Sequence, residues 1–182
     1  MKKSPVITVV AIGIGAALFF VLGRFVAIPS PIPNTNISTQ YGLLSFMAGL
    51  FGPLAGLLIA FIGHALIDFS YGWGIWWSWV IASGAAGLLM GLAAKKLCLS
   101  SEPFDAKKAL TFNIFQVVAN IIAWGLIAPI FDIVIYAEPA NKVFTQGLVA
   151  GLSNIVTTAV IGTLLCFAYS KARPAEGSLK KE

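Results

Sequence analysis

Charged residues are scarce in this sequence. They make up 10% of its 182 residues, whereas 58% are hydrophobic, and a soluble domain normally carries about 25% charged residues. The chain therefore has too little polar surface to cover a water-exposed globule, and lipid is its natural solvent. We expect a single membrane domain over residues 1–170 and a charged cytoplasmic tail over residues 171–182.

Cysteine and histidine are also rare, which limits the chemistry available to the chain. Cys98 and Cys166 are its two cysteines, and both fall near predicted cytoplasmic helix ends, where we expect them to be reduced. His64 is the one histidine, so the two-histidine pattern of a zinc protease cannot form. The sequence shows neither a nucleophile–base pair nor a Walker A motif. We expect no enzyme activity, no metal site and no cofactor.

The basic residues predict orientation and not a nucleic-acid partner. The net charge is +5, but these residues lie between and beyond the apolar segments and form no basic face. With the N-terminus inside, only Arg24 and Lys142 of the twelve basic residues lie toward the outside. The positive-inside rule favours this orientation, with both termini in the cytoplasm of a bacterial cell. The inner residues are Lys2, Lys3, Lys95, Lys96, Lys107, Lys108, Lys171, Arg173, Lys180 and Lys181.

The hydrophobic runs predict an all-α bundle of six transmembrane helices. A helix needs about 20 apolar residues to cross the hydrocarbon. The Pro- and Asn-rich segment 29–36 cannot be helical, and Gly52-Pro53 divides the long apolar stretch that follows it. The predicted spans are Val6–Ile28, a short helix from Tyr41 (or as early as Ile37) to Gly52, Pro53–Phe69, Ile75–Ala94, Ala109–Phe131 and Val143–Tyr169.

The five tryptophans gather on one side of this predicted topology. An interfacial aromatic belt, which is the alternative, would occur at both faces of the membrane. A cluster confined to the outer half instead indicates an aromatic binding cavity that opens to the outside. The residues are Trp73, Trp76, Trp77, Trp79 and Trp124.

Polar side chains within the predicted spans mark the same region. His64 and Asp68 are four residues apart and share one face of the third helix. Ionisable groups in the membrane are costly and often functional, although a histidine hydrogen-bonded within the bundle is the alternative. On the fifth helix, Asn120 and Trp124 lie on one stripe at mid-membrane depth or further out. The predicted ligand-lining residues are His64, Asp68, Trp76, Trp79, Asn120 and Trp124.

Small residues on the first helix indicate close helix packing. Ala11 and Gly15 form one small-xxx-small pair, and Gly13 and Ala17 form another. Such pairs let two helices approach closely, either inside the bundle or against another membrane protein. Spacing alone does not choose between these two roles.

Several segments of the chain together form a recognisable pattern. They are the basic N-terminus before the small-residue first helix, Ile32-Pro33-Asn34-Thr35-Asn36, Phe51-Gly52-Pro53, Phe61-Ile62-Gly63-His64-Ala65-Leu66-Ile67-Asp68 and Trp76-Trp77-Ser78-Trp79. From about Lys2 to Tyr169 the chain resembles the substrate-binding S component of energy-coupling-factor (ECF) transporters, with riboflavin-transporter-like members as the nearest branch.

This resemblance implies a six-helix protein that binds a vitamin or similar micronutrient from the outside. It implies two kinds of partner: a transmembrane coupling (T) subunit and two ABC ATPases, which would hydrolyse the ATP. In that family an Ala-x-x-x-Ala-type motif on the first helix contacts the coupling subunit, and Ala11 and Gly15 match it with Gly in place of the second Ala.

For the substrate, the overall likeness favours cobalamin, with riboflavin as the runner-up. No strong cationic cluster is present, so a multiply phosphorylated ligand is not expected. The rival function is a self-sufficient secondary transporter or channel. Such proteins usually contain inverted repeats, and the two halves of this chain show no convincing repeat.

Overall fold

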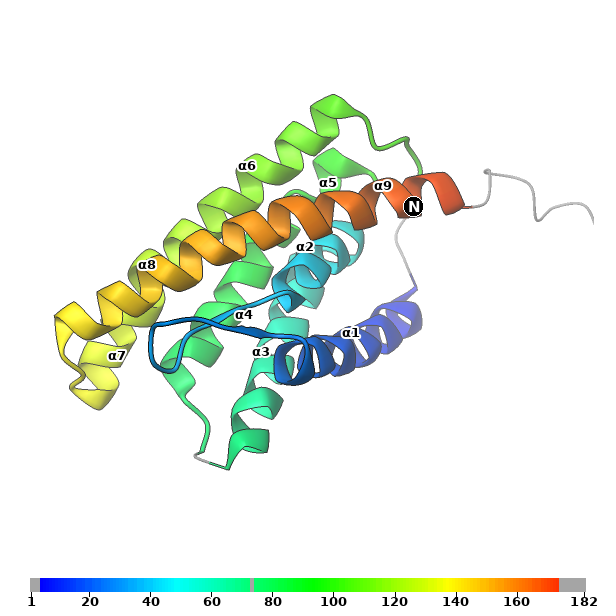
Figure 1. Cartoon of the computed structure of the whole chain (residues 1–182). Helices are drawn as coiled ribbons and strands as arrows, with labels where there is room; N and C mark the ends of the chain where they lie inside the picture. Colours follow the sequence, from blue (N-terminus) through cyan, green and yellow to red (C-terminus); the bar gives the residue numbers. More distant parts are fainter. Residues whose placement is uncertain (1–3, 73, 174–182) are drawn as a thin grey trace, which may run out of the picture.

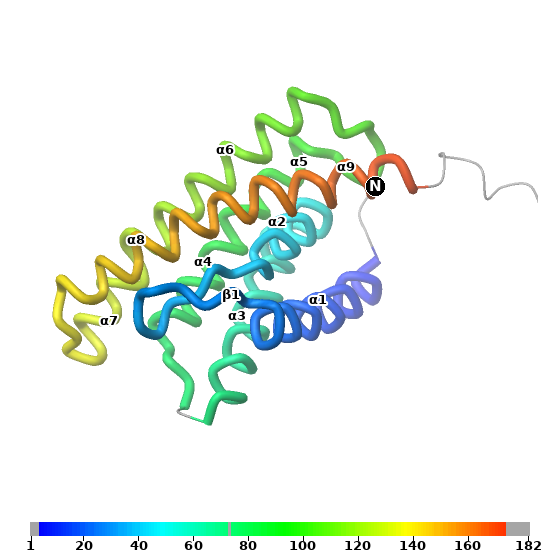
Figure 2. The backbone as a smooth tube through the Cα atoms, viewed as in Figure 1, coloured from blue at the N-terminus to red at the C-terminus, as the bar shows by residue number. Residues whose placement is uncertain are grey.

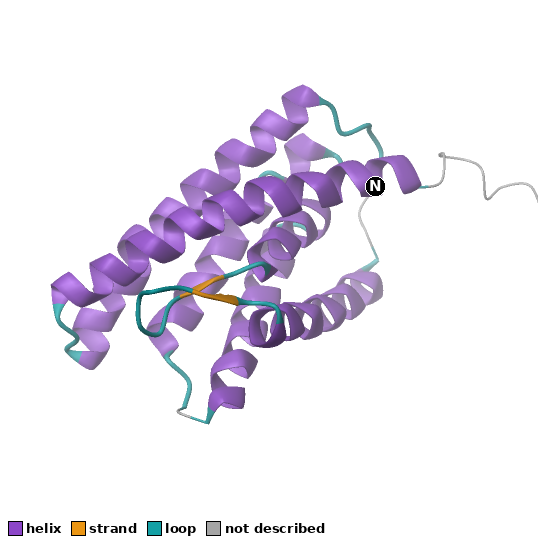
Figure 3. Ribbon diagram, in the orientation of Figure 1, coloured by secondary structure: helices purple, strands orange, loops and turns teal. Residues whose placement is uncertain are grey.

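The chain folds as a helical bundle with one short β-ribbon (Figures 1 and 3). The structure is a computed structural model, and it describes residues 4–72 and 74–173. Strands β1 (Ile28–Pro29) and β2 (Asn36–Ile37) pair in antiparallel fashion. The helices are α1 (Pro5–Phe25), α2 (Gln40–Phe51), α3 (Pro53–Tyr71), α4 (Trp77–Gly91), α5 (Ala94–Leu97), α6 (Ala106–Ile122), α7 (Ala128–Tyr136), α8 (Ala140–Thr157) and α9 (Thr163–Ala172).

Two π-helical turns continue the long helices of the C-terminal half. Turn η1 (Ala123–Ile127) joins α6 to α7, and η2 (Thr158–Gly162) joins α8 to α9. In η1 the backbone N–H of Ala128 bonds to the carbonyl of Ala123, five residues back. Pro129 follows directly and has no N–H to donate. A helix can accommodate the hydrogen bond that proline cannot donate by forming a local π turn, which contains one residue more than an α-turn.

The predicted break between the second and third helices is confirmed. Gly52 has a φ of 92°, in a region that favours glycine, and Pro53 starts α3 at a position where its missing N–H costs nothing. The six predicted helical segments are therefore all present over the described residues. The number of membrane spans is a separate matter, since α2 has only 12 residues and measures about 18 Å at 1.5 Å per residue.

Within residues 4–72 and 74–173, five helical segments are long and apolar enough to cross a membrane. Their outward faces carry large apolar side chains such as Val9, Leu152 and Val160, each more than half exposed. An apolar surface of this extent in a folded bundle indicates contact with lipid, so the protein is a membrane protein. The spans are Pro5–Phe25, Pro53–Tyr71, Trp77–Leu97, Ala106–Tyr136 and Ala140–Ala172.

The start of α1 and the end of α9 lie at the same end of the bundle (Figure 1), and Leu97 of α5 and Cys166 of α9 belong to one buried cluster. Lys95 and Lys96 on α5 and Lys171 on α9 therefore share this end. Four of the basic residues that predicted the orientation, Lys2, Lys3, Lys180 and Lys181, lie outside the described residues. The cytoplasmic location of this end remains a prediction of the positive-inside rule.

Candidate functional site

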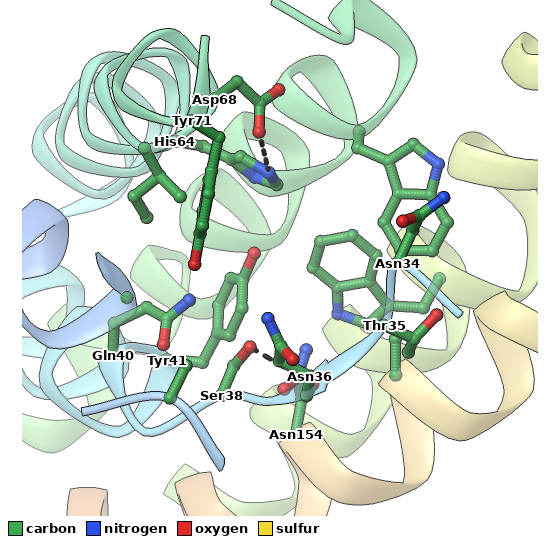
Figure 4. Close-up of a pocket in the computed structure, with 16 residues that line it drawn as sticks. Asn34, Thr35, Asn36, Ser38, Gln40, Tyr41, His64, Asp68, Tyr71 and Asn154 are labelled. Atoms are coloured by element: carbon green, nitrogen blue, oxygen red, sulfur yellow. Dashed lines mark hydrogen bonds and ion pairs between the residues drawn. The ribbon is translucent and has the colours of Figure 1, made fainter. Parts of the chain in front are cut away.

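Two adjoining cavities lie near the end of the bundle opposite the described chain ends. Four residues line both cavities: Asn34, His64, Asp68 and Trp79. The first, of about 120 Å³, also contains Gln40, Tyr41, Trp124 and Asn154 in its wall; we name it the amide chamber (Figure 4). The second, of about 310 Å³, is also lined by Trp76, Asp132, Glu138, Lys142 and Gln146; we name it the carboxylate chamber.

A chain of hydrogen bonds runs along the wall shared by the chambers. The carboxylate of Asp68 accepts a 2.9 Å bond from the backbone N–H of Trp76 and lies 3.6 Å from Nε2 of His64 (Figure 4). Nδ1 of His64 bonds to the hydroxyl of Ser83, which in turn lies 2.7 Å from the hydroxyl of Tyr41. His64 is therefore hydrogen-bonded within the bundle and also lines both cavities, while its contact with a ligand stays a prediction.

Asp132 is the central acidic residue of the carboxylate chamber, and the sequence analysis did not select it. It is only 2% exposed and comes from α7. Its Oδ1 accepts a 2.6 Å bond from the indole N–H of Trp76 and a bond from the hydroxyl of Ser78. Its Oδ2 accepts a 2.6 Å bond from the indole N–H of Trp79. One carboxylate thus fixes the indole of Trp76, which caps the N-terminus of α4, and that of Trp79 in the first turn of α4.

Trp124 forms an aromatic wall of the amide chamber and is 1% exposed. Its ring stacks on that of Trp79 at 5.4 Å between centroids and meets the ring of Tyr41 edge-on at 5.3 Å. Its indole N–H donates a 2.9 Å bond to the side-chain oxygen of Asn120. The amide nitrogen of Asn120 donates in turn to the side-chain oxygen of Gln116 at 3.0 Å. Asn120 therefore fixes the Trp124 indole by a hydrogen bond and does not itself line either chamber.

The backbone of Trp124 is fixed by close contact with α8. A Cβ atom placed on Gly147 would lie 2.2 Å from the carbonyl oxygen of Trp124 and 3.0 Å from Cγ of Pro129. Only glycine therefore allows α8 to pack this closely on η1. Since η1 carries Trp124, this contact sets the position of the aromatic wall.

Two buried side-chain oxygens in the amide chamber have no hydrogen-bond partner in the described part of the chain. They are Oε1 of Gln40 and Oδ1 of Asn154, on residues that are 5% and 1% exposed. Figure 4 shows both residues on the side of the chamber opposite His64 and Asp68. Buried acceptors are nearly always bonded in folded proteins, so these two are available to a ligand or to water.

The segment between α1 and α2 is fastened to α8. It folds back on itself as the β1–β2 ribbon (Figure 2), and β2 contacts α8. The side-chain nitrogen of Gln146 donates a 2.9 Å bond to the carbonyl of Pro33, and the hydroxyl of Thr157 donates a 2.8 Å bond to the carbonyl of Ser38. Asn34, Asn36 and Ser38 from this segment line the amide chamber. The segment is thus one wall of the cavity.

Five of the six predicted lining residues meet at these chambers: His64, Asp68, Trp76, Trp79 and Trp124. Asn120 is adjacent but stands behind Trp124. Trp73, which belongs to the tryptophan cluster identified in the sequence, lies outside the described residues. Trp77 is 44% exposed and its ring lies near that of Phe61. Over the described residues, no group of His, Cys, Asp and Glu is arranged to hold a metal ion.

The two residues predicted to dock a partner, Ala11 and Gly15, face the bundle interior. Both are buried, and a Cβ atom on Gly15 would lie 2.7 Å from Cδ1 of Ile59 on α3. The other small pair, Gly13 and Ala17, is exposed, and a Cβ atom on Gly13 would meet no described atom within 4 Å. In this structure the first pair packs α1 internally, whereas the second pair lies on the outer surface.

These features define a class of protein: a helical membrane protein with a polar, aromatic cavity at one end of the bundle. A family model described as "ECF-type riboflavin transporter, S component" matches residues 3–171. The chain belongs to this S-component family, which confirms the resemblance identified from the sequence. The family consists of transport subunits and not of enzymes.

Similar proteins occur in Lactococcus lactis and Enterococcus faecalis. The chain is 55% identical over 183 residues to a UPF0397 protein of Lactococcus lactis subsp. cremoris (strain NZ9000), with 100% of both chains covered. It is 53% identical over 181 residues to a UPF0397 protein of Enterococcus faecalis (strain ATCC 700802 / V583), covering 100% of this chain and 99% of the relative. Its fold is similar to the crystal structure of the S-component for biotin from an ECF-type ABC transporter, with a TM-score of 0.67, 17% identity and 94% of each chain covered.

Proposed function

We propose that this chain is the substrate-binding subunit of an ECF-type vitamin transporter and captures its substrate in the two joined chambers. The observation that carries the proposal is a cavity that is lined by tryptophan side chains and also contains buried hydrogen-bond acceptors without partners. This cavity occurs in a chain of the S-component family. Aromatic walls with a few placed polar groups are typical of small-molecule sites. The chambers open toward the outside if the basic end of the bundle is cytoplasmic, as the positive-inside rule predicts.

The size of the cavity bears on which vitamin is bound. The larger chamber has about 310 Å³, at the low end of the roughly 300–1,000 Å³ range of small-molecule pockets. A ligand of one to three fused rings is therefore favoured over a corrinoid. Neither the cavity nor the family description supports cobalamin, the substrate that the sequence favoured. Riboflavin, the runner-up, is consistent with the family description.

The partners of this subunit follow from the family. We propose that the chain works with a transmembrane coupling subunit and two ABC ATPases, which supply the ATP hydrolysis. The predicted docking pair Ala11 and Gly15 would have to act through the packing of α1, because both residues are buried. Gly13 and Ala17 offer an exposed small-residue face on the same helix. We propose one membrane domain over residues 1–170 with a cytoplasmic tail over residues 171–182.

Two measurements test this function. Affinity purification of the chain from its native membrane should bring ABC ATPases with it, and mass spectrometry of ligand released from the isolated chain should identify a vitamin. A chain that imports substrate into vesicles without any ATPase would instead be the self-sufficient secondary transporter considered above. That result would overturn the proposal.

A further inference from the structure

Asp132 is a buried carboxyl group for which the described residues supply no positively charged partner. In the part of the chain that the structure describes, three ion pairs occur, His64–Asp68, Lys108–Glu102 and Lys142–Glu138, and none includes Asp132. Its hydrogen-bond donors, two indoles and a hydroxyl, are neutral. Buried carboxylates are almost always paired with a cation, and those inside membrane proteins usually mark substrate or ion sites.

The hydrogen bonds to Asp132 do not remove the need for a counter-charge. Its three donors are neutral, and an opposite charge gains far more in a buried, low-dielectric region than it would in water. Among the described residues Oδ2 accepts one bond, and Asp132 lines the carboxylate chamber. Oδ2 therefore has acceptor capacity left for a ligand in this chamber.

The other charged groups around the carboxylate chamber do not neutralise the charge of an Asp132 carboxylate. Glu138 and Lys142 form a 2.7 Å ion pair with each other and together add no net charge. Asp68 lines the same chamber, and its ion-pair partner among the described residues is His64, at 3.6 Å. With Asp68 and Asp132 ionised, the walls therefore present an excess of negative charge to whatever occupies the cavity. The indole rings of Trp76 and Trp79 add to this preference, because aromatic faces attract cations.

An independent observation comes from the amide chamber. The two buried oxygens without partners, on Gln40 and Asn154, are both acceptors. They call for N–H or O–H donors on the ligand, since an acceptor left unbonded in the bound state costs about 1–3 kcal/mol. Both chambers thus favour a ligand that has several hydrogen-bond donors and little negative charge.

We propose that the substrate is a compact aromatic cation whose positively charged nitrogen lies against Asp132 and whose N–H or O–H donors reach Gln40 and Asn154. This inference rests on the proposed function, because it names the substrate class of the same cavity. It excludes two groups of compounds as the substrate: neutral ring systems such as riboflavin, and phosphorylated or carboxylated vitamins. The aromatic part would lie along Trp76 and Trp79.

Isothermal titration calorimetry on the full chain in detergent tests this inference with three defined probes. They are thiamine, which is a permanent aromatic cation, riboflavin, which is neutral, and riboflavin 5′-phosphate, which is anionic. We expect thiamine to bind at least about tenfold more tightly than riboflavin, a difference that one favourable charge interaction readily supplies. Riboflavin 5′-phosphate should bind most weakly.

Variants connect this ranking to Asp132. In Asp132→Asn, which preserves shape and removes the charge, thiamine should lose at least about tenfold in affinity while riboflavin changes less. Glu102→Gln is the matched control, because Glu102 bonds Lys108 and lies outside the chambers. If Asp132→Asn fails to fold, the ranking of the three probes by the unmodified chain decides the question alone.

Each result has a definite meaning. Tighter binding of riboflavin or its phosphate than of thiamine overturns the cationic substrate and leaves the vitamin-binding function standing. An equal loss for thiamine and riboflavin in Asp132→Asn shows that Asp132 has only a structural role, which also overturns the inference. Failure of thiamine to bind overturns the inference even if the other two probes also fail, whereas the proposed function is tested separately by co-purification of ABC ATPases and by mass spectrometry of the released ligand.

Discussion

The side chain of Gln146 donates a 2.9 Å hydrogen bond to the backbone carbonyl of Pro33, across 113 positions of sequence. This bond joins the start of α8 to the tip of the segment between α1 and α2. Gln146 also lines the carboxylate chamber. The same residue therefore contacts the cavity and holds one of its walls in place.

Replacement of Gln146 by Ala should speed the release of bound ligand. A hydrogen bond of this kind contributes about 1 kcal/mol, which corresponds to about fivefold faster dissociation in a stopped-flow fluorescence experiment. Thr145→Ala is the control, because the Thr145 hydroxyl bonds only to the Asn141 carbonyl of its own helix. Equal dissociation rates for the two variants would show that the segment is held by other contacts.

Trp124→Ala should weaken ligand binding by at least about 1 kcal/mol, as the loss of a buried aromatic anchor usually does. Asn120→Ala should weaken it less, because Asn120 acts through its bond to the Trp124 indole. In the double variant the two losses should not add, since directly bonded neighbours are coupled. Additive losses in titration calorimetry would show that Asn120 acts on the ligand independently of Trp124.

Gly147→Ala should destabilise the fold, because the new Cβ would lie 2.2 Å from the carbonyl oxygen of Trp124. Forcing extra volume into a packed contact typically costs about 1–3 kcal/mol, measurable as a lower Tm in detergent. Gly125→Ala is a close control, because Gly125 is in the same π turn and a Cβ there meets no described atom within 4 Å. A Tm for Gly147→Ala equal to that of the control would contradict the tight contact between α8 and η1.

Substitutions on α1 should separate internal packing from docking. Gly15→Leu should lower the Tm, because its side chain meets Ile59. Gly13→Leu should leave the Tm and ligand affinity unchanged, yet reduce uptake in cells that express the full transporter, since a bulky side chain prevents close helix approach. Normal uptake by Gly13→Leu, with the complex assembled, would exclude the exposed pair as the docking face.

Cys98 should resist a membrane-impermeant thiol reagent in intact cells and react after the cells are opened. It lies in the turn after α5, next to Lys95 and Lys96, which the positive-inside rule places in the cytoplasm. Cys166 is buried, so labelling reports on Cys98, and a Cys98→Ala variant provides the background. Rapid labelling of intact cells would reverse the proposed orientation and place the chambers on the cytoplasmic side.

The sequence predicted the helical segments well, because the apolar runs are long and Gly52-Pro53 is an unambiguous break. It also predicted His64, Asp68 and Trp124 as lining residues, since polar and aromatic residues are conspicuous within such runs. Asp132 was missed because the predicted fifth span ended at Phe131, whereas α7 continues to Tyr136. Its place in the apolar run Leu126–Tyr136 was the signal that could have found it.

Other features of the site depend on contacts that periodicity does not encode. Gln40 lines the cavity because the segment before it folds back against α8, an arrangement that involves residues more than a hundred positions apart. On α1, two small-residue pairs have the same spacing, so the pattern could not say which pair faces inward. The structure assigns Ala11 and Gly15 to the interior through contact with α3.

The π turn at η1 takes up one residue more than an ordinary α-turn does. Within a regular α-helix, one residue corresponds to about 100° of rotation around the axis. Loss of one residue from the regular part of α6 would therefore rotate α7 by about that angle relative to the start of α6, and Asp132 would turn away from Trp76 and Trp79. Loss of one residue from η1 itself would instead restore an α-turn and leave α7 close to its present orientation. The π turn is therefore better able to absorb a one-residue deletion than the regular helix on its N-terminal side.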